Sequence, residues 1–173
     1  SVVVKVDADD YIKGADKFPL EQNRWGFLPI SIQRFLKTDN TKCQISITST
    51  NLKQNHACLL RHGIEINRNQ SFIGCIADVY IDNKETNVVP SIKDMKKILI
   101  MSIDLDKFMS YHNGNLLTLF LKEKEIDIEK YNKSYIYNNI DRANIDQYKF
   151  LSNAIKSYEN FLSYLESDTV LID

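Results

Sequence analysis

Tyr148-Lys-Phe-Leu-Ser-Asn-Ala-Ile-Lys-Ser-Tyr-Glu-Asn-Phe-Leu-Ser-Tyr-Leu165 is the stretch that decides the fold class. Its apolar residues recur at alternating spacings of three and four, which places them on one side of an α-helix. The stripe consists of Tyr148, Leu151, Ile155, Tyr158, Leu162 and Leu165. Asn144 or Asp146 can cap the first turn, because a short side-chain oxygen there accepts a backbone N–H that otherwise has no partner. We therefore predict a long carboxy-terminal amphipathic helix over about 146–166.

Helix signals also lie upstream of this stretch. Ser91 is followed three residues later by Asp94, which approximates a capping box, and apolar residues at helical spacing then predict a helix over about 91–102. Asp104 or Asp106 can open a further helix that would end at Gly114, because glycine tolerates the left-handed conformation at a helix end. Residues 115–121 are apolar over too short a length to distinguish a helix from a buried strand.

The amino-terminal half gives weaker signals. A short helix is expected to begin at Pro29 or Ser31, and residues 44–48 alternate like a strand. Residues 70–80 carry apolar side chains on several faces, as a buried helix does. Together these elements predict a mainly α fold with a minor β component (α+β). We expect residues 1–173 to form a single compact domain closed by the carboxy-terminal helix.

Composition limits the class of protein. The chain has 173 residues, 43% hydrophobic and 26% charged, which are values of a globular domain rather than a disordered tail. The missing initiator methionine indicates an excised piece of a longer protein, and acidic residues that follow the short apolar start do not resemble a signal peptide. The longest apolar run, residues 98–103, is about a third of the ~18 residues that a membrane span needs, so we expect no membrane partner.

The cysteines argue for a reducing, intracellular compartment. Cys43, Cys58 and Cys75 are odd in number and form no C-x-x-C pair, so a disulfide framework of the secreted kind is not expected. His56, Cys58 and His62 offer two imidazoles and a thiol, which are zinc ligands, but the local pattern supplies no fourth donor unless the fold brings Cys43 or Cys75 there. We therefore predict no metal and no cofactor.

An enzymatic role is not expected. Cys58, His62 and Asp78 contain the residue types of a nucleophile, a base and an orienting carboxylate, but no surrounding signature supports that arrangement. The glycine-rich loops that cradle nucleotide phosphates are also missing from the sequence.

Charge is segregated along the chain. The net charge is -1, yet residues 24–68 hold seven Lys or Arg against two acidic residues. Lys and Arg side chains bind phosphate oxygens, and an exposed tryptophan can stack on a base or anchor a partner protein. The candidate nucleic-acid-binding residues are Arg24, Trp25, Arg34, Lys37, Lys42, Lys53, Arg61 and Arg68. The alternative is that Trp25, Phe27 and Leu28 belong to the core and that the charges form an ordinary solvated face.

Several stretches resemble a known family. They are Asn23-Arg-Trp-Gly-Phe-Leu-Pro-Ile-Ser-Ile-Gln-Arg-Phe-Leu36, Cys58-Leu-Leu-Arg-His-Gly-Ile-Glu65, Gln70-Ser-Phe-Ile-Gly-Cys-Ile-Ala-Asp-Val-Tyr80 and the run from Ser157 to Asp173. The chain resembles an internal fragment of the large subunit of the poxvirus-type early transcription factor of large and giant DNA viruses. The resemblance implies a viral initiation factor that recognises early promoters beside a small ATPase subunit and recruits the viral RNA polymerase, in the virion and in the viral factory of the host cytoplasm.

The resemblance assigns no individual DNA-contacting residue, and the family's cysteine-rich stretch has no counterpart here. Two functions from different classes therefore remain. In the first, the fragment contributes to the binding of double-stranded promoter DNA through the basic residues named above, or to assembly with the viral RNA polymerase. In the second, it is a protein–protein interaction module with no direct DNA contact.

Overall fold

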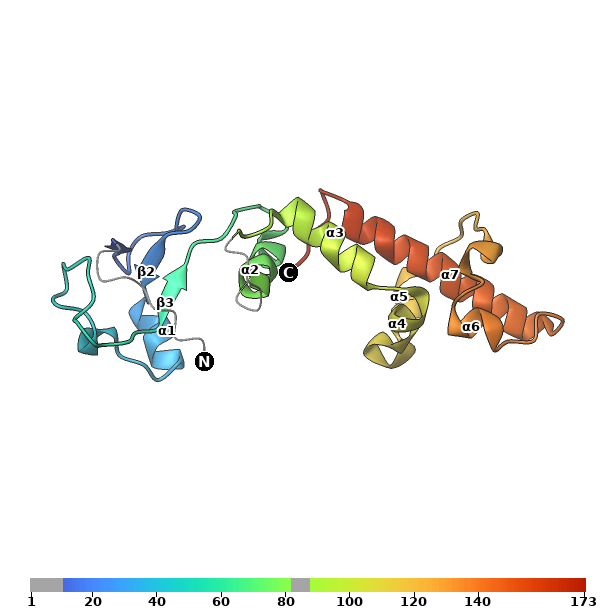
Figure 1. Cartoon of the computed structure of the whole chain (residues 1–173), viewed down its shortest axis with the longest axis horizontal. Coiled ribbons are helices and arrows are strands. Elements are labelled where there is room, and N and C mark those ends of the chain that lie inside the picture. The colour runs from blue at the N-terminus through green and yellow to red at the C-terminus, as the bar shows by residue number, and fades with distance from the viewer. Residues whose placement is uncertain (1–10, 82–87) are drawn as a thin grey trace.

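The computed structural model of the protein describes residues 11–81 and 88–173, and it extends from a small sheet at one end to the helix α7 at the other (Figure 1). In chain order the elements are β1 (Ile12–Lys13), β2 (Trp25–Phe27), α1 (Ile30–Phe35), the 3-10 helix η1 (Asn40–Lys42), β3 (Leu60–His62), α2 (Ser71–Ile81), α3 (Ile92–Ser102), α4 (Leu105–Ser110), η2 (Tyr111–Gly114), α5 (Leu116–Phe120), η3 (Ile128–Tyr131), α6 (Tyr135–Asn138) and α7 (Ile145–Glu166). The predicted mainly α fold with a minor β component is confirmed.

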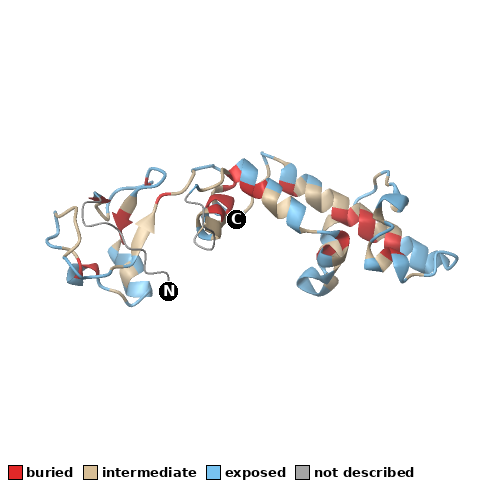
Figure 2. Ribbon diagram, viewed as in Figure 1, coloured by how far each residue is buried: buried red, intermediate tan, exposed pale blue. Residues whose placement is uncertain are grey.

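The carboxy-terminal helix α7 organises the largest core. The side chain of Asn144 accepts the N–H groups of Asp146 and Gln147, which confirms the predicted cap. Leu151 and Ile155 are completely buried, and α4, α5 and α6 pack around them (Figure 2). The burial therefore follows the apolar stripe in the sequence, although Tyr148 at its start remains exposed.

The other predicted helices are also present, with one change. Ser91 caps α3 by accepting the N–H of Asp94, and α2 matches the buried helix expected over residues 70–80. The helix expected from Asp104 to Gly114 ends at Ser110 and continues as η2, in which His112 and Asn113 have positive φ angles. Residues 115–121, which the sequence left open, contain the helix α5.

A second core lies in the middle of the molecule, where the end of the chain returns to α2. Ile73, Ala77, Ile92 and Met95 form this cluster, and Ile172 packs against it. The chain end is fixed by hydrogen bonds to residues about a hundred positions earlier. The side chain of Gln70 donates to the carbonyls of Ser167 and Val170, and the side chain of Asn69 donates to the carbonyl of Thr169. The carbonyl of Asn69 accepts the N–H of Ile172.

Lys96 is a charged residue that joins the second core to the end of the chain. Its side chain is almost fully buried and donates to Gln70 Oε1, the carbonyl of Ser167 and Asp168 Oδ1, each at 3.0 Å. The hydrogen bond and the positive charge of Lys96 lower the pKa of the Asp168 carboxyl. All three ammonium protons therefore have acceptors, which a buried lysine requires.

The three strands form a small sheet in the order β1-β2-β3, parallel between β1 and β2 and antiparallel between β2 and β3. We call residues 11–63, which contain this sheet together with α1 and η1, the N-terminal lobe. Gly63 makes the lobe possible, because a side chain at this position would collide with the backbone carbonyl of Glu21. Phe27 and Leu28 are buried in the lobe, as expected from the alternative in which these residues belong to the core.

The strand predicted over residues 44–48 is wrong. Gln44 makes an isolated bridge to Leu52, while Ile45 and Ile47 are exposed in bends and turns. Apolar alternation predicts a strand only where one face is covered, and nothing in the described part of the chain covers these side chains. The short helix expected at Pro29 or Ser31 is confirmed as α1, which begins directly after Pro29.

The remaining expectations concern the amino terminus, membrane-spanning helices and the number of domains. The amino-terminal stretch weighed as a signal peptide lies outside the described residues. Among the helices of the described ranges, none has both the length and the apolar character of a bilayer-crossing segment. The expectation of a single domain stays a prediction.

Candidate nucleic-acid interface

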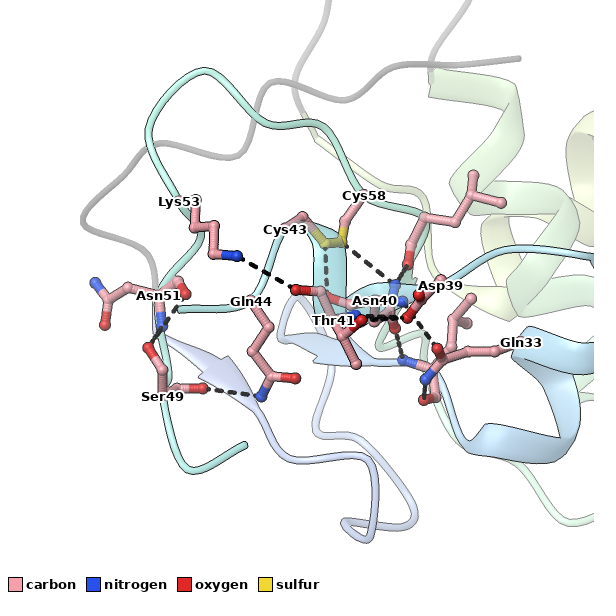
Figure 3. Close-up of a disulfide and its surroundings, with 12 residues drawn as sticks. Gln33, Asp39, Asn40, Thr41, Cys43, Gln44, Ser49, Asn51, Lys53 and Cys58 are labelled. Atoms are coloured by element: carbon pink, nitrogen blue, oxygen red, sulfur yellow. Dashed lines mark hydrogen bonds between the residues drawn. A yellow bond between two sulfur atoms is a disulfide. The ribbon is translucent and has the colours of Figure 1, made fainter. Parts of the chain in front are cut away.

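Asn40 is the buried polar residue around which the N-terminal lobe is built (Figure 3). Its side-chain oxygen accepts the N–H of Leu28 at 2.8 Å, and its Nδ2 donates to the carbonyl of Leu59 at 3.1 Å. Its own N–H donates to Oε1 of Gln33 at 2.8 Å, which attaches α1 to the rest of the lobe. Three segments that carry candidate residues are therefore positioned by one asparagine.

Cys43 and Cys58, which lie on either side of a long loop, form a disulfide bond (Figure 3). The sequence analysis expected a reducing compartment and no disulfide framework, so this single bond corrects the expected state of these two thiols. The physical reason is again Asn40: Cys43 follows it at the end of η1, and Nδ2 of Asn40 lies 3.3 Å from the sulfur of Cys58. The third cysteine, Cys75, is free and exposed.

A thiol count tests the disulfide. Without reductant, the denatured chain should react with one equivalent of a thiol reagent, from Cys75, and after reduction it should react with three, because a disulfide does not react. The variant Cys75→Ser is the control and should show no reactive thiol before reduction. Three reactive thiols in unreduced protein purified without reductant would contradict the pairing.

Five of the candidate cations are exposed to solvent: Arg24, Arg34, Lys37, Lys42 and Arg68. The carboxylate of Glu21 lies 3.7 Å from Arg24, but no ion pair or hydrogen bond within the described residues occupies the charged groups of the other four. Arg34 belongs to α1, Lys37 follows it, Lys42 ends η1, and Arg68 lies in the connection to α2. These charged groups are therefore available to phosphate oxygens.

Arg61, also a candidate for phosphate binding, is held inside the lobe by hydrogen bonds. Its guanidinium donates to the carbonyls of Phe27, Lys17 and Gly14 at 2.8 to 3.0 Å, and it stacks over the ring of Phe18. Burial lowers the pKa of Arg61, and the nearby Asp16 carboxylate partly offsets this effect. Arg61 therefore ties the sheet to the preceding loop, and its donors are engaged inside the lobe.

Lys53 and Trp25 are only partly exposed. The ammonium of Lys53 donates to the carbonyl of Thr41, although the 3.4 Å distance leaves a weak bond. Trp25 stacks on His62 of the neighbouring strand, with 4.4 Å between the ring centres. One face of the indole is therefore already occupied, which reduces the area available for stacking on a base.

The metal ligands considered from the sequence do not come together. His56 Nδ1 lies 2.8 Å from the carbonyl of Gln54, whereas His62 Nδ1 lies 2.8 Å from Asp78 Oδ2, and Cys58 is in the disulfide. No group of three or more His, Cys, Asp or Glu residues able to hold a metal ion occurs in the described ranges. The His62–Asp78 pair does form, but the proposed nucleophile, Cys58, has no free thiol.

The residues that hold the candidate nucleic-acid-binding residues in place were not predicted from the sequence. Asn40 begins a 3-10 helix and Gln33 lies in a short α-helix, and neither position has a sequence pattern that distinguishes a buried anchor from a solvated residue. No sequence signal marks Arg61 either, because the carbonyls that it bonds belong to residues 34 to 47 positions earlier in the chain.

Comparison of the chain with protein-family models, with curated proteins and with solved structures found no match.

Proposed function

We propose that the chain is part of a viral early transcription initiation factor and that its N-terminal lobe contacts promoter DNA through the phosphate backbone. The observation that carries this proposal is the set of exposed cations without a partner within the described residues: Arg34, Lys37 and Lys42 in the lobe, and Arg68 in the connection that follows it. The lobe itself holds eight Lys or Arg against three Asp or Glu, a formal charge of +5 in a chain of net charge -1. Local positive charge of this kind attracts duplex DNA without reading its sequence.

The proposed role is binding rather than catalysis. Phosphate contacts would fix the position of the factor on the duplex, while sequence recognition would come from other contacts. The small ATPase subunit, the viral RNA polymerase and the location in virions and viral factories enter this proposal through the family resemblance alone.

A salt titration tests the DNA contact. We expect the chain to bind a duplex of unrelated sequence at ~50 mM salt, with a log–log slope of affinity against salt of about -3 to -4 if four phosphates are engaged. Removing two charges with Arg34→Gln and Lys37→Asn should make this slope shallower by about 2, because a protein that makes fewer phosphate contacts releases fewer counterions when it binds. Asn is chosen at position 37 because Lys37 has a φ of 53°.

The matched control removes two exposed lysines from outside the N-terminal lobe, with Lys133→Gln and Lys149→Gln. This variant loses the same net charge, so it should keep the slope of the parent. Undetectable binding at ~50 mM salt, or an equal loss in both double variants, would contradict a specific role of the N-terminal lobe.

A second function, protein–protein assembly without DNA contact, is favoured by one separate observation. The helix α1 has no buried residue, and Phe35 on it is 82% exposed. Absence of salt-dependent DNA binding would therefore make assembly the better account of the lobe.

A further inference from the structure

The apolar side chains of α1 and of its last turn face solvent. Ile30 is 65% exposed, Phe35 is 82% exposed, and Ile32 and Leu36 are each more than 40% exposed. Ile32, Phe35 and Leu36 stand at positions i, i+3 and i+4, so they share one side of the helix. At 100° per residue, Phe35 lies nearly opposite Gln33, whose amide bonds the carbonyl of Leu28 and the N–H of Asn40. The helix is therefore attached to the lobe through Gln33, and its apolar side is left exposed, unlike that of an ordinary surface helix.

Packing does not account for this apolar face. A helix of six residues is unstable by itself and normally gains its stability from a buried apolar face. Here the hydrogen bonds of Gln33 and Asn40 hold the helix instead. Contiguous exposed apolar side chains with no role in the fold mark a surface for a partner.

The charges beside this apolar surface are positive. Arg34 lies within α1 and Lys37 follows Leu36 directly, and neither side chain has an ion pair within the described residues. The acidic residue between positions 30 and 42 is Asp39, whose carboxylate is engaged by the N–H and hydroxyl of Thr41 at the start of η1. These hydrogen bonds lower the pKa of Asp39, so the carboxylate stays charged but is turned toward η1.

We propose that α1 binds an acidic, amphipathic segment of a partner protein, with Phe35 as the apolar anchor and with Arg34 and Lys37 as the charged rim. The surface has an apolar centre and cations beside it, so its complement has apolar side chains flanked by carboxylates. Duplex DNA satisfies the cations but offers little that would bury Ile32, Phe35 and Leu36. The proposal goes beyond the DNA contact and does not depend on it, because its main contribution comes from apolar side chains.

A peptide titration tests this surface. The probe is a synthetic helical peptide of about 16 residues with Leu or Phe at positions i, i+3, i+4 and i+7 and Glu at the remaining exposed positions. The comparison peptide has Lys in place of every Glu. We expect fluorescence anisotropy to show saturable binding of the acidic peptide to the full chain and at least about tenfold weaker binding of the basic peptide.

Three variants separate the contributions. Phe35→Ala should weaken binding of the acidic peptide about tenfold or more, because a central aromatic anchor is lost. The pair Arg34→Gln and Lys37→Asn should weaken it by up to about fivefold, as for exposed ion pairs. The control Phe150→Ala removes a 49% exposed ring from α7 and should leave binding unchanged. Each replaced side chain is exposed, so folding should be retained.

Several outcomes would overturn the proposal. Absence of binding, equal affinity for the two peptides, or unchanged affinity after Phe35→Ala would each do so. Duplex DNA affinity reduced as strongly by Phe35→Ala as by the charge variants would make α1 a DNA-contacting element instead. If the peptide binds only after residues 1–10 are deleted, the occupant is the chain's own amino terminus. Loss of DNA binding with intact peptide binding would contradict only the proposed DNA contact.

Discussion

Replacement of Leu151 with alanine should lower the free energy of unfolding by about 2–5 kcal/mol. Leu151 is fully buried in the core formed by α4, α5, α6 and α7, where Phe108 and Ile155 are also fully buried. The truncated side chain loses its transfer from water, and the rigid neighbours Phe108 and Tyr158 can close the resulting cavity only partly. Urea denaturation followed by circular dichroism measures the change.

Leu119→Ala is the matched control. Leu119 belongs to α5, which packs on α7, but its side chain is 72% exposed. The same chemical change there should alter the free energy of unfolding by less than about 0.5 kcal/mol, because little area and no cavity are involved. If the Leu151 variant were as stable as the Leu119 variant, α7 would not bury its predicted stripe.

Replacement of Asn40 with alanine should destabilise the N-terminal lobe by about 2–4 kcal/mol. The change leaves the buried N–H of Leu28 and the carbonyl of Leu59 without their side-chain partner. A buried group left unsatisfied, such as the N–H of Leu28, costs about 1–3 kcal/mol, since it has lost water without gaining a hydrogen bond, and the partly buried carbonyl of Leu59 costs less. The loss should concentrate in α1, η1 and β3, which amide hydrogen exchange can localise.

Asn138→Ala provides the comparison for this prediction. Asn138 also donates to two carbonyls, those of Asn132 and Ser134, but it is exposed, so water can replace the lost bonds. Its replacement should cost at most about 1 kcal/mol. Faster hydrogen exchange throughout the helical part after Asn40→Ala, with no preference for the lobe, would argue against a local anchoring role.

The helices could be predicted because their signals are local. The caps at Ser91 and Asn144 and the periodicity of residues 148–165 lie within the elements that they specify. The strands could not, because β1, β2 and β3 have only two or three residues each, too few to establish an alternation. The sheet depends instead on approaches between distant segments, such as the contact of Gly63 with the backbone of Glu21.

The candidate surface could be predicted only in part, for a related reason. Charge counts identified the basic segment, but exposure separates Arg34 and Lys37, which are open to solvent, from Arg61, which bonds three carbonyls. An arginine that binds backbone and an arginine that binds phosphate look alike in sequence, because the guanidinium is a donor in both cases. The exposed apolar side of α1 could not be predicted, because a short run of apolar residues does not show in the sequence whether other segments cover its side chains.

The return of the chain end to α2 also constrains the order in which the protein can fold. Ile172 packs against the second core, and the buried ammonium of Lys96 donates to the carbonyl of Ser167 and the carboxylate of Asp168. During synthesis, Lys96 is made about seventy residues before Ser167 and Asp168. Contacts of such long sequence separation form late. The buried ammonium of Lys96 must therefore stay hydrated in the nascent chain, and the centre of the molecule is expected to close last, after the cores on both sides of it.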